Sequence, residues 1–438
     1  MKKKFVYFVS LGCSRNLVDS ETMIYKLSLA NYHLTNEITK ADALVVNTCG
    51  FLKEARDEGY SVLDEMFEEK KDSAKVIVTG CMANLFFNEI KKKYKNLHSI
   101  ISAGEVNSIV EAVTDKIIKN DKKSFIQQRD FKRVLTTPSH LAYLKISEGC
   151  QKRCSYCIIP KIKGPLISRT VDSIIEEFKH LLENGVFEIN LIAQDLLDYG
   201  KDRNEKDALI NLIKEILKIK KDFWLRLHYV YPDDITDEFI DLILSDNRIC
   251  NYLDMPLQHV SNNVLKNMRR KTTKENIIKI FSTLRKKDKS FTIRTSLMVG
   301  FPNETEDDFN ELLKFIEDYQ IDHIGVFKYV DEPFASSFKF DNKIDQKIID
   351  ERFEQLTKKQ FDLVQKRNKK LIGKEIDVLV DGYHKESDLL CVGRTKSLAY
   401  DVDSNIIIND ISKIDSFGKI YNAKIIDNVG YDLLAQIK

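Results

Sequence analysis

The sequence predicts an α/β protein with an N-terminal parallel α/β domain, a central partial βα barrel, and a small C-terminal β-barrel. Two patterns lead to this prediction. Apolar runs of strand length alternate with helix-like segments through most of the chain. After Gly373, short segments separated by Gly, Asp and Asn turns replace that alternation. With 438 residues, of which 43% are hydrophobic, the chain is long enough for several cores.

Three apolar runs near the N-terminus each end in a cysteine. The runs and their cysteines are 5–12 with Cys13, 43–48 with Cys49, and 75–80 with Cys81. Each run is typical of a parallel strand buried on both faces, and helix-like segments follow at 17–29, 53–70 and 84–95. Because the carboxyl ends of parallel strands lie at one edge of their sheet, we expect the three thiols to converge. Together they would form a metal-cluster site, in addition to one at the cysteines between 150 and 157. Three small cysteines that only pack at strand ends are an equally good interpretation of the pattern.

A second alternation of strands and helices begins at Leu141. The strand candidates are 141–147, 187–193, 224–230, 252–257, 291–299 and 323–329, and the helix-like stretches between them include 171–184, 208–218, 235–244 and 306–319. Six such units predict a partial or full barrel whose chemistry lies at the carboxyl ends of its strands. Cys150 follows the first of these strands and is therefore expected at that rim.

Cys150, Cys154 and Cys157 are the most informative residues of the chain, with the spacing C-x3-C-x2-C. An electron-transfer cubane cluster takes four cysteines, so three leave one iron without a protein ligand. An open iron suits enzymes that cleave S-adenosylmethionine into a radical. A zinc site would need a fourth ligand, for which His140 is awkwardly placed. A disulfide cannot use three thiols evenly, and chance clustering of three among eight cysteines is the remaining alternative.

The patterns divide the chain into an N-terminal domain at 1–118, a linker at 119–135, a central domain at 136–370 and a β-barrel at 371–438. A charged helical connector at 341–370 ends the central domain. The strand candidates of the last part are 375–380, 389–392, 405–408 and 423–429.

The C-terminal part carries 8 Lys and Arg against 11 Asp and Glu, a net charge of −3. An RNA-binding module is usually basic, so an acidic one better suits a basic partner such as a ribosomal protein. Acids that merely occupy solvated turns explain the count equally well.

The N-terminus faintly imitates a lipoprotein signal, since three lysines precede a seven-residue apolar stretch and Cys13. A buried first strand explains it better, and we expect a cytoplasmic protein with reduced thiols. No apolar run approaches the length of a membrane helix, so no membrane partner is expected. The net charge of +2 gives no general argument for nucleic acid.

The cysteine loop, with Tyr156 before its last cysteine, resembles the radical S-adenosylmethionine superfamily. Together with the N-terminal cysteines and the terminal β-barrel, essentially the whole chain resembles the methylthiotransferases. This resemblance implies two [4Fe-4S] clusters, one held by Cys150, Cys154 and Cys157 and an auxiliary one held by Cys13, Cys49 and Cys81. It also implies S-adenosylmethionine as radical source and methyl donor, and a C-terminal TRAM domain.

Several motifs resemble the branch of that family that modifies an aspartate of a small-subunit ribosomal protein. They are Ser-Leu-Gly-Cys-Ser-Arg-Asn-Leu-Val-Asp-Ser-Glu at 10–21, Ser-Glu-Gly-Cys at 147–150, Ala-Gln-Asp at 193–195 and His-Tyr-Val-Tyr-Pro at 228–232. The segments 163–169 and 331–335 depart from the family pattern, which puts details of substrate and cofactor contacts in doubt. The resemblance implies conversion of the aspartate to 3-methylthioaspartate with electrons from an unidentified donor.

Two other functions stay open at this point. One is methylthiolation of adenosine in transfer RNA, which differs only in substrate. The other is a non-enzymatic RNA-binding or scaffold protein with zinc or structural cysteines.

Five residues at the predicted rim are candidate contacts of S-adenosylmethionine. They are Gln194, Asp195, Arg226, Arg294 and Gly300. For each, an ion pair or a turn inside the barrel is an equally good interpretation. His259 is expected in the core, and Cys250 and Cys391 are expected to be structural because they have no partner cysteines.

Overall fold

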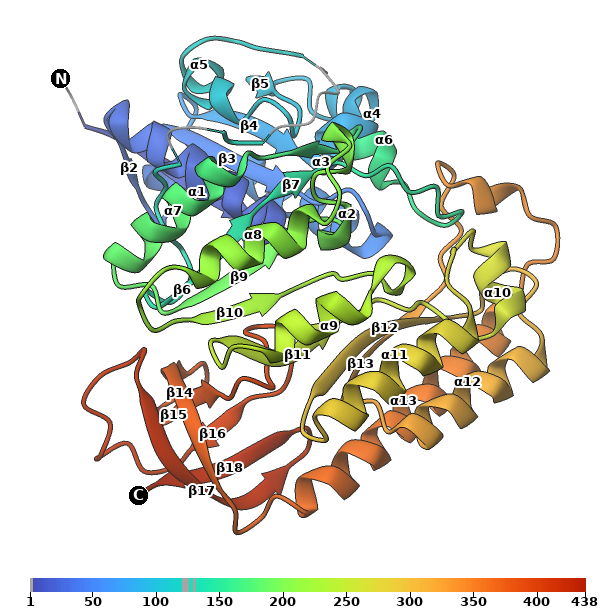
Figure 1. Ribbon diagram of the computed structural model, residues 1–438. Coiled ribbons are helices and arrows are strands. Elements are labelled where there is room, and N and C mark those ends of the chain that lie inside the picture. Colours follow the sequence, from blue (N-terminus) through green and yellow to red (C-terminus); the bar gives the residue numbers. More distant parts are fainter. Residues whose placement is uncertain (1–2, 120–125, 129–130) are drawn as a thin grey trace.

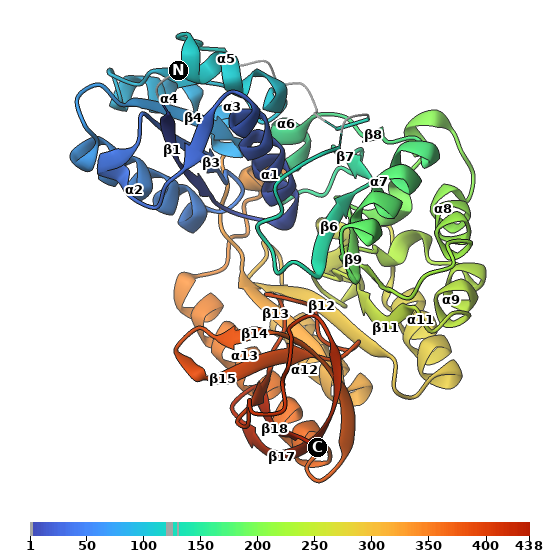
Figure 2. The same ribbon diagram turned by 90° about the vertical axis from the view of Figure 1, so that its left-hand side faces the viewer.

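The computed structural model describes residues 3–119, 126–128 and 131–438. Three main sheets follow one another along the chain. Figures 1 and 2 place the N-terminal sheet and the C-terminal barrel on opposite sides of a central six-stranded sheet. The predicted fold class is therefore confirmed. Residues 120–125 and 129–130 of the predicted linker at 119–135 lie outside the described residues.

The N-terminal sheet has five parallel strands in the order β2-β1-β3-β4-β5. The strands are β1 (Lys4–Ser10), β2 (Tyr32–Leu34), β3 (Ala43–Thr48), β4 (Lys75–Gly80) and β5 (Ser99–Ile100). The α-helices around it are α1 (Ser14–Leu29), α2 (Lys53–Glu69), α3 (Cys81–Leu85), α4 (Phe87–Lys93) and α5 (Ile109–Thr114). All six residues of β3 are buried, as its continuous apolar run predicts.

The predicted single helix at 84–95 is wrong, because the chain forms α3 and α4 with a break at Phe86. Phe86 leaves the helical conformation with φ −108° and ψ 23°. Its ring packs edge-on against Phe334, 5.5 Å between centroids, and lies under the guanidinium of Arg56. A contact with a residue far along the chain thus overrides the local helical pattern.

The central sheet has six parallel strands in the order β13-β12-β11-β10-β9-β6 and forms an open, partial barrel. Its strands are β6 (Leu141–Lys145), β9 (Glu188–Ile192), β10 (Trp224–Leu227), β11 (Ile249–Asp254), β12 (Thr292–Val299) and β13 (His323–Lys328). A short hairpin of β7 (Ser147–Glu148) and β8 (Ile167–Ser168) flanks it. The predicted strand at 224–230 ends early, since Tyr229 has φ 62°, and the predicted strand at 252–257 begins and ends three residues earlier.

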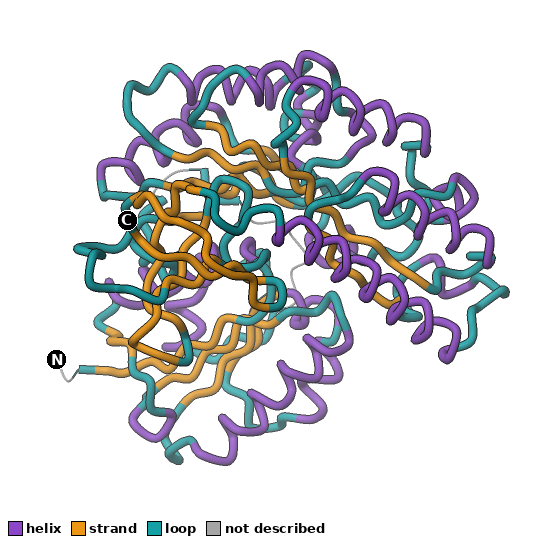
Figure 3. The backbone as a smooth tube through the Cα atoms, turned by 90° about the horizontal axis from the view of Figure 1, so that it is seen from below, coloured by secondary structure: helices purple, strands orange, loops and turns teal. Residues whose placement is uncertain are grey.

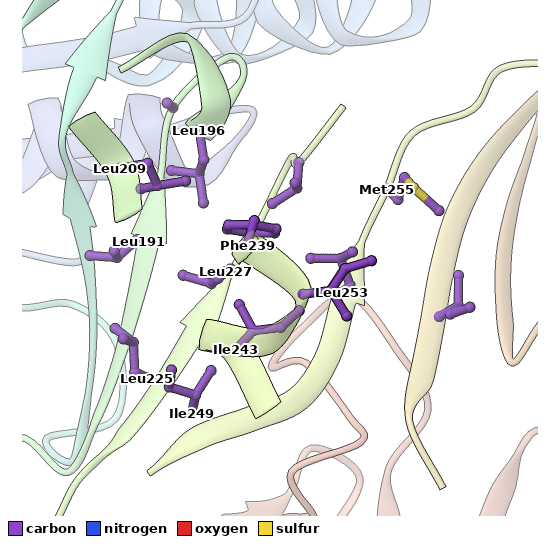
Figure 4. Packing of buried hydrophobic residues seen from close by; sticks show 14 of the residues in the cluster. Leu191, Leu196, Leu209, Leu225, Leu227, Phe239, Ile243, Ile249, Leu253 and Met255 are labelled. Carbon is purple, nitrogen blue, oxygen red and sulfur yellow. The ribbon is translucent and has the colours of Figure 1, made fainter. Parts of the chain in front are cut away.

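Helices cover the outer face of this sheet, as the view from below shows (Figure 3). They are α7 (Val171–Glu183), α8 (Ala208–Leu217), α9 (Asp237–Leu244), α10 (Asn262–Asn267), α11 (Lys274–Lys287), α12 (Glu306–Tyr319) and α13 (Gln346–Lys369), whereas the short α6 (Ile159–Lys163) contacts α3 of the N-terminal domain. The apolar side chains of strands and helices interlock in the largest core of the chain. Figure 4 shows part of it, with Leu225 and Leu227 of β10 beside Phe239 and Ile243 of α9.

Helix α12 begins with a capping box. The side chain of Thr305 accepts a hydrogen bond from the backbone N–H of Asp308, whose carboxylate accepts one from the N–H of Thr305. We expect Thr305→Ala to lower the free energy of unfolding by about 1 kcal/mol, because the first turn loses a partner for one N–H group. Chemical denaturation of the two proteins measures this loss. Thr283→Ala is the matched control, since its hydroxyl only bonds back to Lys279 within exposed helix α11. A loss as large in the control would contradict the capping role.

The C-terminal part forms a closed five-stranded barrel. Its strands are β14 (Glu375–His384), β15 (Ser387–Arg394), β16 (Ile406–Ile408), β17 (Ile420–Val429) and β18 (Asp432–Ile437), in the order β14-β15-β16-β18-β17. The sequence pattern identified four of these segments and missed β18. The missed strand is needed for closure, because it pairs with both β16 and β17.

Buried ion pairs join the C-terminal barrel to the central sheet. Arg394 of β15 bonds to Glu188 of β9 at 2.7 Å and to Asp381 of β14 at 2.7 Å. Glu188 also accepts from Arg226 of β10 at 2.8 Å, and Asp381 lies 2.9 Å from the Nε2 atom of His140. All five side chains are less than 9% exposed. The two barrels therefore share a polar core and are not loosely tethered.

Among the residues that the structure describes, no helix combines the length and apolar character that crossing a membrane requires.

Candidate active site

Cys13, Cys49 and Cys81 lie at one edge of the N-terminal sheet, on three loops that follow neighbouring strands. Cys13 precedes α1, Cys49 follows β3, and Cys81 begins α3. The loops pack so closely that a Cβ atom added to Gly12, which has φ +91°, would lie 3.2 Å from the Sγ atom of Cys49. Only glycine allows both this backbone conformation and this approach.

The three thiols are close enough to influence one another's ionisation. Burial, with smaller contributions from the other two thiols, raises the pKa of Cys81 to about 12. Burial likewise raises the pKa of Cys49. Burial alone would also raise the pKa of Cys13, but Arg15 and Lys163 lower it below its ordinary value. A soft metal would deprotonate such thiols on binding, so the donor set fits an iron–sulfur cluster.

Cys150, Cys154 and Cys157 lie on the loop after the β7 strand, at the carboxyl end of the central sheet. Burial is the main cause that raises the pKa of Cys150 to about 11 and that of Cys157 to about 12. The N–H of Ile159 donates to the Sγ atom of Cys157 at 3.5 Å, and Arg270 lies 3.9 Å from the Sγ atom of Cys154. N–H donors and a cation are suitable surroundings for thiolates that hold an anionic cluster.

Gly149 fixes the start of this loop. It has φ +84°, and an added Cβ atom would lie 1.9 Å from the carbonyl oxygen of Pro165. The backbone at the start of the cysteine loop therefore lies directly against the backbone of Pro165, just before β8.

No three His, Cys, Asp or Glu side chains in the described ranges are arranged to hold a single metal ion. The cysteines of a cubane cluster each bind a different iron, so this observation is compatible with two clusters.

A cavity of about 230 Å³ lies between the N-terminal domain and the central sheet, with Cys157 in its lining. Arg15 and Phe51 line it from the N-terminal side, and Cys157, Tyr229 and Tyr231 line it from the central side. Several other lining residues lie in the carboxyl-terminal halves of central strands or directly after them, as the barrel prediction requires. They include Gln194, Pro256, Gln258, Ser296, Met298, Phe327 and Tyr329.

A buried ion network fixes the N-terminal domain against the central sheet beside this cavity. Asp19 of α1 pairs with Lys145 of β6, and the Nζ atom of Lys163 lies 3.4 Å from both Asp19 and Glu148. Lys145 also reaches Glu148 at 3.0 Å. All four side chains are buried. Burial raises the pKa of Glu148, but the lysines outweigh it, so the pKa of this carboxyl lies well below its ordinary value.

Of the five predicted cofactor contacts, only Gln194 lines the cavity. Its amide nitrogen donates to Glu148, and its Oε1 atom has no hydrogen-bond partner among the described residues. Asp195 lies next to it and pairs with Lys152 at 2.9 Å. Burial raises the pKa of Asp195 to about 6, although Lys152 lowers it.

The other three candidates lie elsewhere. Arg226 belongs to the ion pairs beneath the central sheet and also donates to the carbonyl of Lys396. Arg294 pairs with Asp254 at 2.8 Å. Gly300 packs against α13, where an added Cβ atom would lie 2.4 Å from the Cγ1 atom of Ile349. The structure thus gives each of them a partner or packing contact away from the cavity that Cys157 lines.

Several residues near the cysteines were not among the sequence candidates. Arg15, Tyr229 and Tyr231 line the cavity, Arg270 contacts the Sγ atom of Cys154, and Glu148 bonds to the cavity residue Gln194. Arg15 and Glu148 each lie two residues from a predicted cysteine ligand, and this proximity in the sequence could have identified them as site residues. Arg270 lies in a basic run far from any cysteine, and only the fold brings it to Cys154.

Three family descriptions match consecutive parts of the chain. Residues 5–102 match the uncharacterized protein family UPF0004, residues 144–316 match the radical SAM superfamily, and residues 372–437 match the TRAM domain. The matched segments lie within the predicted domains, and the domain boundaries themselves stay a prediction.

Curated relatives are similar over the whole chain. A ribosomal protein uS12 methylthiotransferase RimO from Protochlamydia amoebophila is 47% identical over 99% of this chain and 92% of its own length. Proteins of the same name from Chlamydia caviae and Geobacter sulfurreducens are 44% and 37% identical over 99% of this chain, and over 95% and 99% of their own lengths.

Solved structures share the fold at low sequence identity. The radical S-adenosylmethionine methyltransferase TsrM from Kitasatospora setae, with tryptophan substrate and a SAM analogue bound, has a TM-score of 0.58. It is 13% identical and covers 82% of this chain and 89% of its own. Because the relatives that match over nearly the whole chain are RimO proteins, the chain belongs to the RimO family of radical S-adenosylmethionine methylthiotransferases.

Proposed function

We propose that this protein attaches a methylthio group to an aspartate of the small-subunit ribosomal protein uS12, giving 3-methylthioaspartate. The observation that carries the proposal is that Cys13, Cys49 and Cys81 follow three neighbouring strands at one sheet edge. A buried ion network joins their domain to the central sheet, beside a cavity that Arg15 and Cys157 line. Cys150, Cys154 and Cys157 would hold one [4Fe-4S] cluster, and Cys13, Cys49 and Cys81 the auxiliary one. When bound, the clusters supply one-electron cleavage of S-adenosylmethionine and a sulfur atom for transfer.

The side chains around the cavity have separate tasks in this proposal. The unpartnered Oε1 atom of Gln194 would accept a hydrogen bond from S-adenosylmethionine, while Glu148 fixes the orientation of the amide. Tyr229, Tyr231 and Phe51 form walls that exclude water, which protects a reactive radical. Arg270 balances the charge on Cys154. The target carbon has no acidic proton, so a general base would not suffice.

The partners follow from the same proposal. The substrate is uS12, free or on the ribosome, and an electron donor has to reduce the radical-generating cluster. We place the protein in the cytoplasm, where ribosomes and reduced thiols occur together.

Iron analysis of anaerobically reconstituted protein tests the two clusters. We expect about eight irons per chain in the wild type and about four after Cys13, Cys49 and Cys81 are all changed to alanine. That triple variant should still cleave S-adenosylmethionine but transfer no methylthio group, whereas Cys150→Ala should abolish cleavage. Cys391→Ala, a buried cysteine of the C-terminal barrel, is the matched control and should keep about eight irons. About four irons in the wild type would exclude the second cluster.

Mass spectrometry of a deletion strain tests the substrate. The proposal requires uS12 to lose the mass of one methylthio group, while modified adenosines of transfer RNA stay unchanged. The opposite pattern would favour the transfer-RNA alternative.

A further inference from the structure

Arg15 lines the cavity between the N-terminal domain and the central sheet. It is the second residue of α1, and its Nη1 atom donates to the carbonyl of Ala193 at 2.7 Å. Its guanidinium also stacks over the ring of Tyr229, 5.1 Å from the centroid. In the sequence Arg15 is two residues from Cys13, and in the structure it lines the same cavity as Cys157. Arg15 is therefore close to a cysteine of each group.

Arg15 has no acidic partner within 3–119, 126–128 or 131–438, since no Asp or Glu oxygen lies within 4.0 Å of it. Other cations around the site are neutralised. Lys163 pairs with Asp19 and Glu148, and Lys152 pairs with Asp195. Arg270 lacks a carboxylate as well, but it contacts the thiol of Cys154 and the carbonyl of Pro256.

The contacts of Arg15 fix its position and leave most of its N–H groups unused. A guanidinium carries five N–H donors in a planar fork that matches a carboxylate. Among the described residues, one hydrogen bond of the Arg15 side chain is formed, to Ala193. The stacking on Tyr229, held at φ 62°, orients the plane of the fork. A charged fork that is fixed in place and lines a cavity is a binding site for an anion.

We infer that Arg15 binds the side-chain carboxylate of the target aspartate and so determines specificity for aspartate over asparagine. The inference rests on the proposed function. The reacting carbon has to lie between the source of the radical and the source of the sulfur, which is where Arg15 lies. In aspartate this carbon is bonded directly to the carboxylate, so an arginine that holds the carboxylate also places the carbon. Asparagine has the same shape but lacks the charge that the fork requires.

Two other roles for Arg15 make different predictions. As a counter-ion of the auxiliary cluster, it would affect iron content. As a ligand for the carboxylate of S-adenosylmethionine, it would affect the affinity for that cofactor. Neither role would affect the preference between aspartate and asparagine.

Binding measurements on reconstituted full-length protein test the inference. The probes are recombinant uS12 and the same protein with asparagine at the target position. We expect the wild type to bind the aspartate form at least about tenfold more tightly. Arg15→Gln should bind both forms equally, with iron content and affinity for S-adenosylmethionine within about twofold of wild type. Arg15→Lys should keep part of the preference, because lysine retains the charge but not the fork.

Lys53→Gln is the matched control, because Lys53 lines the same cavity but is exposed and pairs with Asp57. It should keep the full preference for aspartate. The inference is overturned if Arg15→Gln still prefers the aspartate form, if it loses about half of its iron, or if only its affinity for S-adenosylmethionine falls. A wild-type protein that does not modify uS12 would refute the proposed function instead. Retained modification by the wild type together with a retained preference in Arg15→Gln refutes the role of Arg15 alone.

Discussion

Replacing Arg394 with methionine is expected to lower the free energy of unfolding of the two joined barrels by about 3–5 kcal/mol. Arg394 is 0% exposed and is shared by two buried carboxylates, Glu188 and Asp381. Methionine fills much of the same volume, but it removes a positive charge that both carboxylates need in an interior without water. Removing one member of a buried ion network is costly because the remaining charges lose a partner in an interior where water cannot replace it.

Hydrogen exchange at strands β9 and β14 measures this effect, because those strands carry the two carboxylates. Lys419→Met is the matched control in the same barrel. Lys419 pairs with Asp415 at 3.1 Å, but both side chains are at least 60% exposed. We expect the control to change stability by no more than about 0.5 kcal/mol. Similar small changes in both variants would show that the joint between the barrels is not held by these charges.

The stability of the protein is expected to fall in acid because of His259, which is 0% exposed. Burial is the largest cause that lowers the pKa of His259 to about 3, from an ordinary value of 6.5. Its Nδ1 atom accepts a hydrogen bond from the N–H of Ser261 at 3.0 Å, so the folded ring is neutral. Below pH 6.5 the unfolded chain binds a proton that the folded chain does not. Protonation of the unfolded chain therefore lowers the free energy of unfolding by about 1.4 kcal/mol per pH unit as the pH falls from 6.5 towards 3. Above pH 6.5 this loss is absent.

Asparagine at position 259 separates this effect from general acid denaturation. Its side-chain oxygen can still accept from Ser261, but it does not titrate. Between pH 6.5 and 4.5 we expect His259→Asn to lose about 3 kcal/mol less than the wild type, measured by chemical denaturation at each pH. His33→Asn changes an exposed histidine and should follow the wild type. Identical pH profiles for wild type and His259→Asn would exclude the buried ring as the cause.

Features that depend on local sequence were predictable. The runs that become β1, β3 and β4 are continuously apolar, and the cysteines follow them directly, so their meeting at one sheet edge could be expected. The six central strands were found for the same reason. The short strands β2 and β5 were not expected, because two or three residues carry no periodic signal.

Features that depend on distant partners could not be predicted. Arg226 and Arg294 were expected to contact the cofactor because each lies on a barrel strand. Their partners include Lys396 and Asp403, more than 100 residues along the chain, and no local pattern reveals them. Tyr229 ends β10 early for a similar reason, since its ring stacks with Arg15 of another domain. The roles of Arg226, Arg294 and the other candidate contacts stay predictions.

The contact between α1 and the central sheet helps to set the distance between the two groups of cysteine thiols. Asp19 and Lys163 belong to different domains, yet they meet in a closed network with Lys145 and Glu148. The distance between the groups is thus set by contacts between folded domains. This network is one such contact, and the bond from Arg15 to the carbonyl of Ala193 is another.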